Sequence, residues 1–158
     1  MIRPARPGEL EALRDLERAA GRAFAAIGMP EIARDEPPPA AELAHAWVAT
    51  DERDAPVAYL LSSIVDDCAH IDQVSVAPSH ARRGLGAALI EHLDARARAE
   101  GRAALTLTTF RDVPWNAPYY ERLGFRVFEP GPELAAIVAE EACRIPGDAP
   151  RVAMRRPL

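Results

Sequence analysis

One stretch of the sequence combines the residue types that bind a phosphate group. Residues 71–90 read IDQVSVAPSHARRGLGAALI, an apolar run, then a proline, two arginines and a glycine pair, then a second apolar run. If these are a strand, a turn and a helix, the first amides of the helix lack partners and its dipole adds positive charge. Glycines let a diphosphate approach the backbone, while Arg82 and Arg83 add fixed charge. The stretch predicts an anion site, most simply for pyrophosphate, with a tight turn bearing surface arginines as the alternative.

A second stretch carries groups that could exchange protons. Residues 109–125 read TFRDVPWNAPYYERLGF and place Asn116 and two tyrosines on a short predicted helix. A positioned tyrosine hydroxyl can act as a general acid. The alternative for Tyr120 is an aromatic side chain packed against the sheet.

Other common nucleotide and metal sites do not fit. A dinucleotide fingerprint requires a third glycine where Leu89 stands and an acidic residue near 103–105, where the sequence reads AAL. All 19 basic residues are arginine, so the lysine of a phosphate-binding P-loop is missing. The four histidines and two cysteines show no metal-ligand spacing, and we expect no metal and reduced thiols.

The elements that must position these residues alternate along the chain. Hydrophobic periodicity, turn residues and glycine stops predict strands over 2–5, 45–50, 57–65, 69–76, 103–109, 125–128 and 151–155, and helices over 10–27, 40–44, 84–100, 114–123 and 133–143. Two short turns, at 51–56 and 66–67, predict an antiparallel meander. The strand–helix–strand segment 69–109 predicts two parallel neighbouring strands. We expect an α/β fold with a mixed sheet in one domain, residues 1–158.

Composition sets the protein class. The chain has 158 residues, of which 49% are hydrophobic and 27% charged, as in ordinary globular proteins. A formal charge of −5 argues against nucleic acid and anionic membranes as partners. The sequence has no apolar run long enough for a membrane span and no signal-peptide pattern at its start, so we expect a cytoplasmic protein.

Together the two stretches resemble the GNAT N-acetyltransferase superfamily. Its coenzyme motif, V-x-P followed by [QR]-x-x-G-x-[GA], is matched by residues 76–78 (VAP) and 81–86 (ARRGLG). Its second signature, Y-x-x-x-G-F, is matched by residues 120–125. The resemblance implies a mixed, mostly antiparallel sheet with a central parallel strand pair splayed around the βαβ unit and helices on both faces.

The resemblance also implies acetyl-CoA as acyl donor. Amides near Val74 and Val76 would hold the pantetheine and the acetyl carbonyl, and Tyr120 would protonate the departing thiolate. The residues implied in coenzyme binding are Val74, Ser75, Val76, Arg82, Arg83, Gly84, Leu85, Gly86, Ala87 and Asn116. Two positions depart from the family pattern, since Ala81 replaces [QR] and Val113 replaces an asparagine whose contact Asn116 could supply.

Two residues on the strand over 69–76 could accept the proton of the amine. A glutamate found in some family members corresponds to His70, and Asp72 lies one strand repeat closer to the motif. Alternation places His70, Asp72, Val74 and Val76 on one face and Ile71, Gln73 and Ser75 on the other. A hydrogen-bonded strand residue without a catalytic role is an equally good interpretation of either candidate.

The preferred function is acetyl transfer to a primary amine of a small molecule or peptide, by direct attack in a ternary complex. A non-catalytic acyl-CoA sensor is the alternative, and charged tRNA as acceptor is disfavoured by the acidic charge. Acidic residues Glu31, Asp35, Glu36 and Glu42 would suit a cationic amine or form a solvated loop. The helix over 133–143 could restrict the acceptor, and the sequence leaves open whether the protein is a homodimer.

Overall fold

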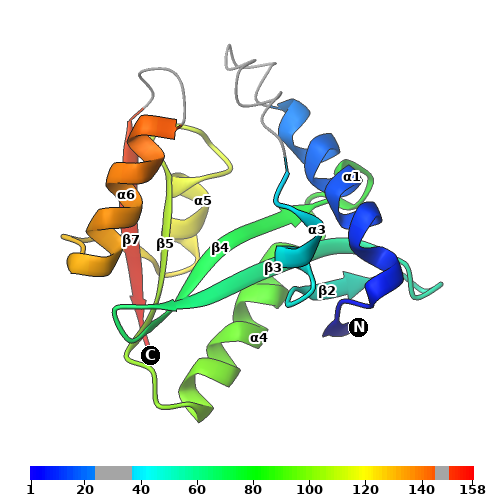
Figure 1. Cartoon of the computed structure of the whole chain (residues 1–158), viewed down its shortest axis with the longest axis horizontal. Coiled ribbons are helices and arrows are strands. Elements are labelled where there is room, and N and C mark those ends of the chain that lie inside the picture. The colour runs from blue at the N-terminus through cyan, green and yellow to red at the C-terminus, as the bar shows by residue number, and fades with distance from the viewer. Residues whose placement is uncertain (24–36, 145–149) are drawn as a thin grey trace. The chain divides into compact units, whose positions relative to one another are not determined.

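The computed structural model describes residues 1–23, 37–144 and 150–158 (Figure 1). The strands are β1 (Ile2–Pro4), β2 (Trp47–Thr50), β3 (Pro56–Val65), β4 (Cys68–Val76), β5 (Ala104–Phe110), β6 (Arg126–Val127) and β7 (Arg151–Pro157). The helices are α1 (Leu10–Gly21), α3 (Ala40–Leu43), α4 (Leu85–Ala99), α5 (Ala117–Arg122) and α6 (Pro132–Arg144). Each predicted element has a counterpart. The last predicted positions of the first helix, Phe24 and Ile27, and the acidic residues at 31–36 lie outside the described residues.

The strands form one mixed sheet of seven, in the order β1-β2-β3-β4-β5-β7-β6. The predicted parallel neighbours are confirmed, because Ala69 pairs with Leu105 and His70 with Thr106 in the same direction. The β1–β2, β2–β3, β5–β7 and β6–β7 pairs are antiparallel. The α/β class and the mostly antiparallel sheet with a parallel pair are therefore as predicted.

Residue contacts divide the chain into two compact units. The first unit comprises residues 1–62 and 73–92, and the second comprises 63–72 and 93–158. Strands β3 and β4 and helix α4 each contribute residues to both units. Each unit has its own hydrophobic cluster.

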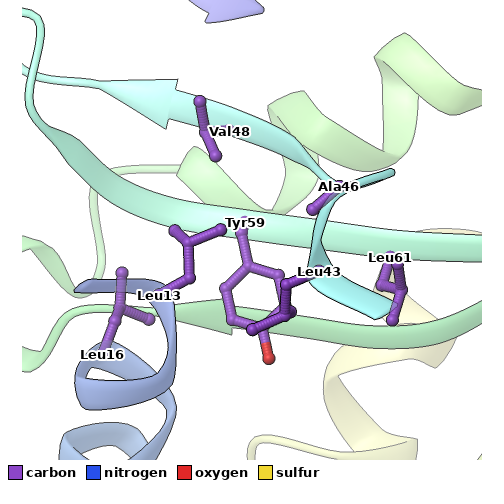
Figure 2. Close-up of a cluster of buried hydrophobic side chains, with 7 residues drawn as sticks. All are labelled: Leu13, Leu16, Leu43, Ala46, Val48, Tyr59 and Leu61. Carbon is purple, nitrogen blue, oxygen red and sulfur yellow. The ribbon is translucent and has the colours of Figure 1, made fainter. Parts of the chain in front are cut away.

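The core of the first unit forms between α1, α3 and the β2–β3 pair. Leu13, Leu16 and Leu43 come from the helices and pack with Ala46, Val48, Tyr59 and Leu61 (Figure 2). Val48 and Tyr59 are direct cross-strand partners, so their side chains share the face that the helices cover. Leu13, Leu43, Val48 and Tyr59 have no exposed surface.

Two helices lie on opposite faces of β5 in the second unit. Thr108 donates a hydrogen bond to Glu141 of α6, whereas its neighbour Thr109 donates to Asn116 at the start of α5. Consecutive strand residues point to opposite faces, so α5 and α6 cover different sides of this strand. On the α6 side, Leu134 packs with Val65 and Ala153.

The start of α6 is held by the turn between β3 and β4. The two carboxylate oxygens of Asp66 accept hydrogen bonds from the backbone amides of Glu133 and Leu134, at 3.1 and 3.0 Å. Glu133 returns a bond, since its carboxylate accepts the amide of Asp66 at 2.7 Å. Asp66 and Asp67 both adopt positive φ, 50° and 61°, as a tight hairpin turn requires.

None of the helices in the described ranges is long and apolar enough to cross a membrane.

Candidate functional site

The predicted anion site is a left-handed turn that leads into α4. A short 3-10 turn, Pro78–His80, follows β4, and α4 begins at Leu85. Arg82 and Gly84 have φ values of 63° and 77°. A Cβ atom at Gly84 would meet nothing within 4 Å, so the glycine is required by its backbone conformation and not by crowding.

The electrostatics of this turn favour an anion. Arg82, Arg83 and Gly84 are exposed, and the first turn of α4 contains no acidic residue. The first hydrogen bond of the helix runs from the amide of Ala88 to the carbonyl of Gly84, at 2.9 Å. Amides that precede Ala88 in the helix have no acceptor one turn back and can bind a ligand. The predicted residues 82–87 thus lie together in a loop and helix start suited to pyrophosphate.

The end of β4 carries a polar network on the face toward α1. Glu17 of α1 accepts hydrogen bonds from the Tyr59 hydroxyl and the Gln73 amide, both at 2.9 Å. Ser75 also donates to Glu17 and accepts from Gln73. Gln73 and Ser75 therefore share one face, as predicted for these two residues, and Val74 between them points to the other face.

Glu17 is a polar residue of this region that sequence reasoning missed. Ser75 and Glu17 are 58 residues apart, and Glu17 stands in an ordinary amphipathic helix pattern, so no local signal marks the contact. Burial of Tyr59 and the charge of Glu17 raise the pKa of that tyrosine above its usual range. The phenol therefore stays protonated and donates to the carboxylate.

Tyr120 lies on α5 in the second unit, partly buried, at the start of a tight turn. Its carbonyl accepts the amides of Leu123 and Phe125, at 3.0 and 3.1 Å. Gly124 has a φ of 95°, which explains the glycine of the second signature. The Tyr120 and Phe125 rings meet edge to face with centroids 5.9 Å apart, and Phe125 is fully buried.

Asn116 joins the start of α5 to the end of β5. Its side-chain oxygen accepts the Thr109 hydroxyl at 2.6 Å. Val113, at the position where the family pattern has asparagine, is 5% exposed and belongs to the core. The side-chain oxygen of Asn116 is thus used in positioning α5.

The two candidate proton acceptors differ in their surroundings. His70 is 3% exposed, and its Nδ1 lies 2.9 Å from the Thr106 hydroxyl oxygen. Burial lowers the pKa of His70, and the negative charge of Glu141 opposes that effect. Asp72 is exposed and accepts a hydrogen bond from Ser63 at 3.0 Å.

The structure collects the predicted site residues into two groups. The first unit contains Val74–Val76 and residues 82–87, and the second contains His70, Asp72, Asn116 and Tyr120. In the described part of the chain, no group of three or more histidine, cysteine, aspartate or glutamate residues is arranged to hold a metal ion.

Comparison with known proteins identifies the family. The family model "Acetyltransferase (GNAT) family" matches residues 10–125, which is more than half of the chain. The chain therefore belongs to the GNAT acetyltransferase family.

Solved structures confirm the fold. The ribosomal-protein-S18-alanine N-acetyltransferase from Escherichia coli is 22% identical, with a TM-score of 0.68 over 99% of this chain and 92% of that one. The PaiA N-acetyltransferase from Thermoplasma acidophilum, solved with coenzyme A, is 14% identical with a TM-score of 0.69 over 100% and 98% of the two chains. A GNAT-family acetyltransferase from Staphylococcus aureus is 12% identical, with a TM-score of 0.74 over 100% and 98%.

Proposed function

We propose that the chain is an acetyl-CoA-dependent N-acetyltransferase that acts on a primary amine of a small molecule or peptide. The observation that carries the proposal is the left-handed Arg82–Gly84 turn at the start of α4, in a chain of an acetyltransferase family. A positive-φ glycine, two exposed arginines and a helix N-terminus without acidic residues are what a diphosphate requires.

Each part of the coenzyme has proposed partners. The pyrophosphate binds the amides and side chains of residues 82–87. The pantetheine and the acetyl carbonyl bind backbone amides near Val74–Val76, with Asn116 as a further coenzyme contact. A fixed amide donor at the carbonyl oxygen stabilises the oxyanion of the tetrahedral intermediate, and loss of such a donor costs about 2.7–4 kcal/mol in other acyl-transfer enzymes.

Acetyl transfer is proposed as direct attack of the amine on the thioester. The neutral amine nitrogen forms a bond to the acetyl carbon, the carbon–sulfur bond breaks, and the electron pair leaves on the coenzyme sulfur. The Tyr120 hydroxyl gives its proton to that thiolate, which general-acid catalysis makes about 10²–10⁴-fold faster. The proton released by the amine passes to a base, and solvent returns a proton to Tyr120.

His70 is the first candidate for this base, and Asp72 is the second. Because burial lowers its pKa, His70 is neutral at pH 7 and able to accept a proton. The negative charge of Glu141 then favours the imidazolium ion that forms. Asp72 is exposed and could act through a water molecule.

Two observations bear on the acceptor. The E. coli structural relative is by its name an N-acetyltransferase for an alanine of a ribosomal protein, which favours a peptide amine as one class to screen. Helix α6 covers the face of β5 that carries Thr108, where the hydroxyl contacts Glu141. We propose that this helix limits the size of the acceptor.

Thermal unfolding with acetyl-CoA tests coenzyme binding, with ATP and NAD as controls. A ligand at 100 times its Kd stabilises the protein by about 2.7 kcal/mol, or roughly 5–10 °C for a chain of this size. Gly84→Ala should abolish the shift. Gly101→Ala is a matched control, because Gly101 follows the other end of α4, has a φ of 74° and also has open space. Equal shifts in the two variants would contradict the proposed site.

Turnover separates the enzyme from a non-catalytic sensor. Acetyl-CoA is incubated with a panel of small-molecule and peptide amines, and release of the coenzyme thiol is followed. Tyr120→Phe should keep the thermal shift and lose about 10²–10⁴-fold in kcat. A chain that binds acetyl-CoA but releases no thiol with any amine in the panel would favour the sensor.

A further inference from the structure

A largely buried ion pair connects α4 to the strand β7. Asp94 of α4 is 5% exposed, and its two carboxylate oxygens accept hydrogen bonds from different arginines. Arg98, one helical turn further on, donates from Nε at 2.6 Å, and Arg156 of β7 donates from Nη2 at 2.9 Å. The side chain of Arg156 is 15% exposed and that of Arg98 is 57% exposed. Arg156 is therefore the less exposed of the two arginines that contact Asp94.

Arg156 also holds the turn that follows Tyr120. Its Nη1 donates to the carbonyl of Leu123 at 3.1 Å. Its guanidinium carbon lies 5.9 Å from the centre of the Phe125 ring. A Cβ atom at Gly124 would sit 3.6 Å from the Arg156 Cδ, so the arginine side chain passes directly along this glycine.

The same turn fixes both the backbone and the ring of Tyr120. Leu123 and Phe125 donate their amides to the Tyr120 carbonyl, and the Phe125 ring packs against the Tyr120 ring. Helix α5 spans only residues 117–122, a length at which a helix is not stable without tertiary contacts. The carbonyl of Leu123, the residue after the helix, accepts a hydrogen bond from Arg156. A side chain from β7 thus stabilises the C-terminal end of α5.

We propose that Arg156, oriented by Asp94, is a positioning residue for Tyr120. The planar guanidinium donates to Asp94 from one nitrogen and to the Leu123 carbonyl from another, and so fixes the turn relative to α4. An ammonium group on a flexible stem does not reproduce this two-sided geometry. The inference rests on the proposed role of Tyr120 as general acid. A displacement of about 1 Å in a positioned group can reduce a rate about 10²-fold.

Four variants test the role of Arg156 in catalysis. We expect Arg156→Met and Arg156→Lys to reduce kcat about 10- to 100-fold while the KM for acetyl-CoA changes less than about twofold. Asp94→Asn should reduce kcat in the same direction. Arg98→Met is the matched control, because it removes the other partner of Asp94 without touching the turn. Thermal unfolding of every variant shows whether the compared proteins are folded. If Arg156→Met does not fold, Arg156→Lys, which keeps the positive charge, still tests the proposal.

A double variant distinguishes positioning of Tyr120 from a general structural effect. If Arg156 acts through Tyr120, Tyr120→Phe combined with Arg156→Lys should have the same kcat as Tyr120→Phe alone. A further multiplicative loss in the double variant, or full kcat in both Arg156 variants, would overturn the proposal.

A spectroscopic measurement keeps the inference separate from the proposed function. Fluorine NMR of protein labelled with 3-fluorotyrosine gives a signal for each of the three tyrosines, assigned by Tyr→Phe variants. Arg156→Lys should move the Tyr120 signal, and Arg98→Met should not. If Tyr120→Phe retains full kcat, the acid role fails while this signal still decides whether Arg156 positions the ring. An unmoved signal would overturn the positioning role.

Discussion

Replacing Asp66 by alanine removes the carboxylate that holds the start of helix α6. Asp66 accepts the amides of Glu133 and Leu134, the second and third residues of the helix, and Leu134 is 1% exposed. The carboxylate is also closely packed, since a Cβ atom at Gly131 would lie 2.9 Å from its Oδ2. Asp66 has a φ of 50°, a conformation that aspartate tolerates better than alanine.

The expected loss of stability has two components. Loss of a helix-capping carboxylate costs about 0.5–2 kcal/mol. A residue other than glycine in the left-handed conformation costs about 1–2 kcal/mol, and alanine lacks the local hydrogen bonds with which aspartate offsets it. We therefore expect Asp66→Ala to lower the free energy of unfolding by about 1.5–4 kcal/mol. In Asp66→Gly the capping bonds are lost but the backbone is unstrained, so the expected loss is about 0.5–2 kcal/mol.

Urea unfolding gives the ranking, and hydrogen exchange gives the location. Asp66→Asn keeps one acceptor oxygen and the left-handed tendency, so its loss should be smaller than that of Asp66→Ala. Protection of amides in α6 should fall in the alanine and glycine variants, while that in α1 is unchanged. Asp67→Gly is the control, because Asp67 also has a positive φ, 61°, and its carboxylate accepts a hydrogen bond from Arg102 instead of from the start of α6. Equal unfolding free energies for the alanine and glycine variants would refute the contribution from backbone strain, and unchanged α6 protection would refute the cap.

Three further measurements test other parts of the structure. His70→Asn should remove a pH dependence of stability: the pKa of His70 is lowered by burial, so the unfolded chain takes up this proton first as the pH falls below about 6.5. The wild type should then lose stability relative to the variant by at most about 1.4 kcal/mol per pH unit until the folded pKa is reached, and parallel unfolding curves from pH 7.5 to 5 would contradict this. Glu17→Ala leaves the buried Tyr59 hydroxyl without this acceptor and should cost about 1–3 kcal/mol in urea unfolding, with less further loss when Tyr59→Phe is added. Arg151→Met should destabilise α6, because Arg151 forms an ion pair with Glu141; unchanged hydrogen exchange in α6 would contradict that expectation.

Local patterns were sufficient to predict the elements and their pairing. Gly101 and Gly124 follow the helices α4 and α5, as predicted, and both have a positive φ, which excludes most other residues. Short turns and the strand–helix–strand segment gave the antiparallel and parallel neighbours. The predicted bounds of a helix were least accurate where a side-chain hydrogen bond holds the adjoining turn. The helix predicted from residue 114 begins at Ala117, because Asn116 is held in a non-helical conformation by its bond to Thr109.

Contacts between distant residues could not be predicted from the sequence. Sequence motifs singled out Val74–Val76 and Tyr120 as candidate site residues. Glu17, which contacts β4, and Arg156, which contacts the turn after Tyr120, belong to no motif. Arginine and glutamate are common at exposed positions, so residue type alone does not show that Glu17 and Arg156 are partly buried and make specific contacts. The catalytic role of His70 remains a prediction, although its burial, which alternation alone does not give, is now established.

The position of β7 has a consequence for the order in which the second unit folds. β7 lies between β5 and β6 in the sheet and pairs with β5 over seven residue pairs, from Ala104–Pro157 to Phe110–Arg151. β6 pairs with β7 and stands at the edge of the sheet. Both β5 and β6 therefore lack β7 as a pairing partner until residues 151–157 have left the ribosome. Strand pairing across so long a separation is slow, and unpaired strand edges promote aggregation. A nascent chain stalled before residue 151 should therefore bind chaperones and be cleaved by proteases within β5, whereas the first unit can complete its own core earlier.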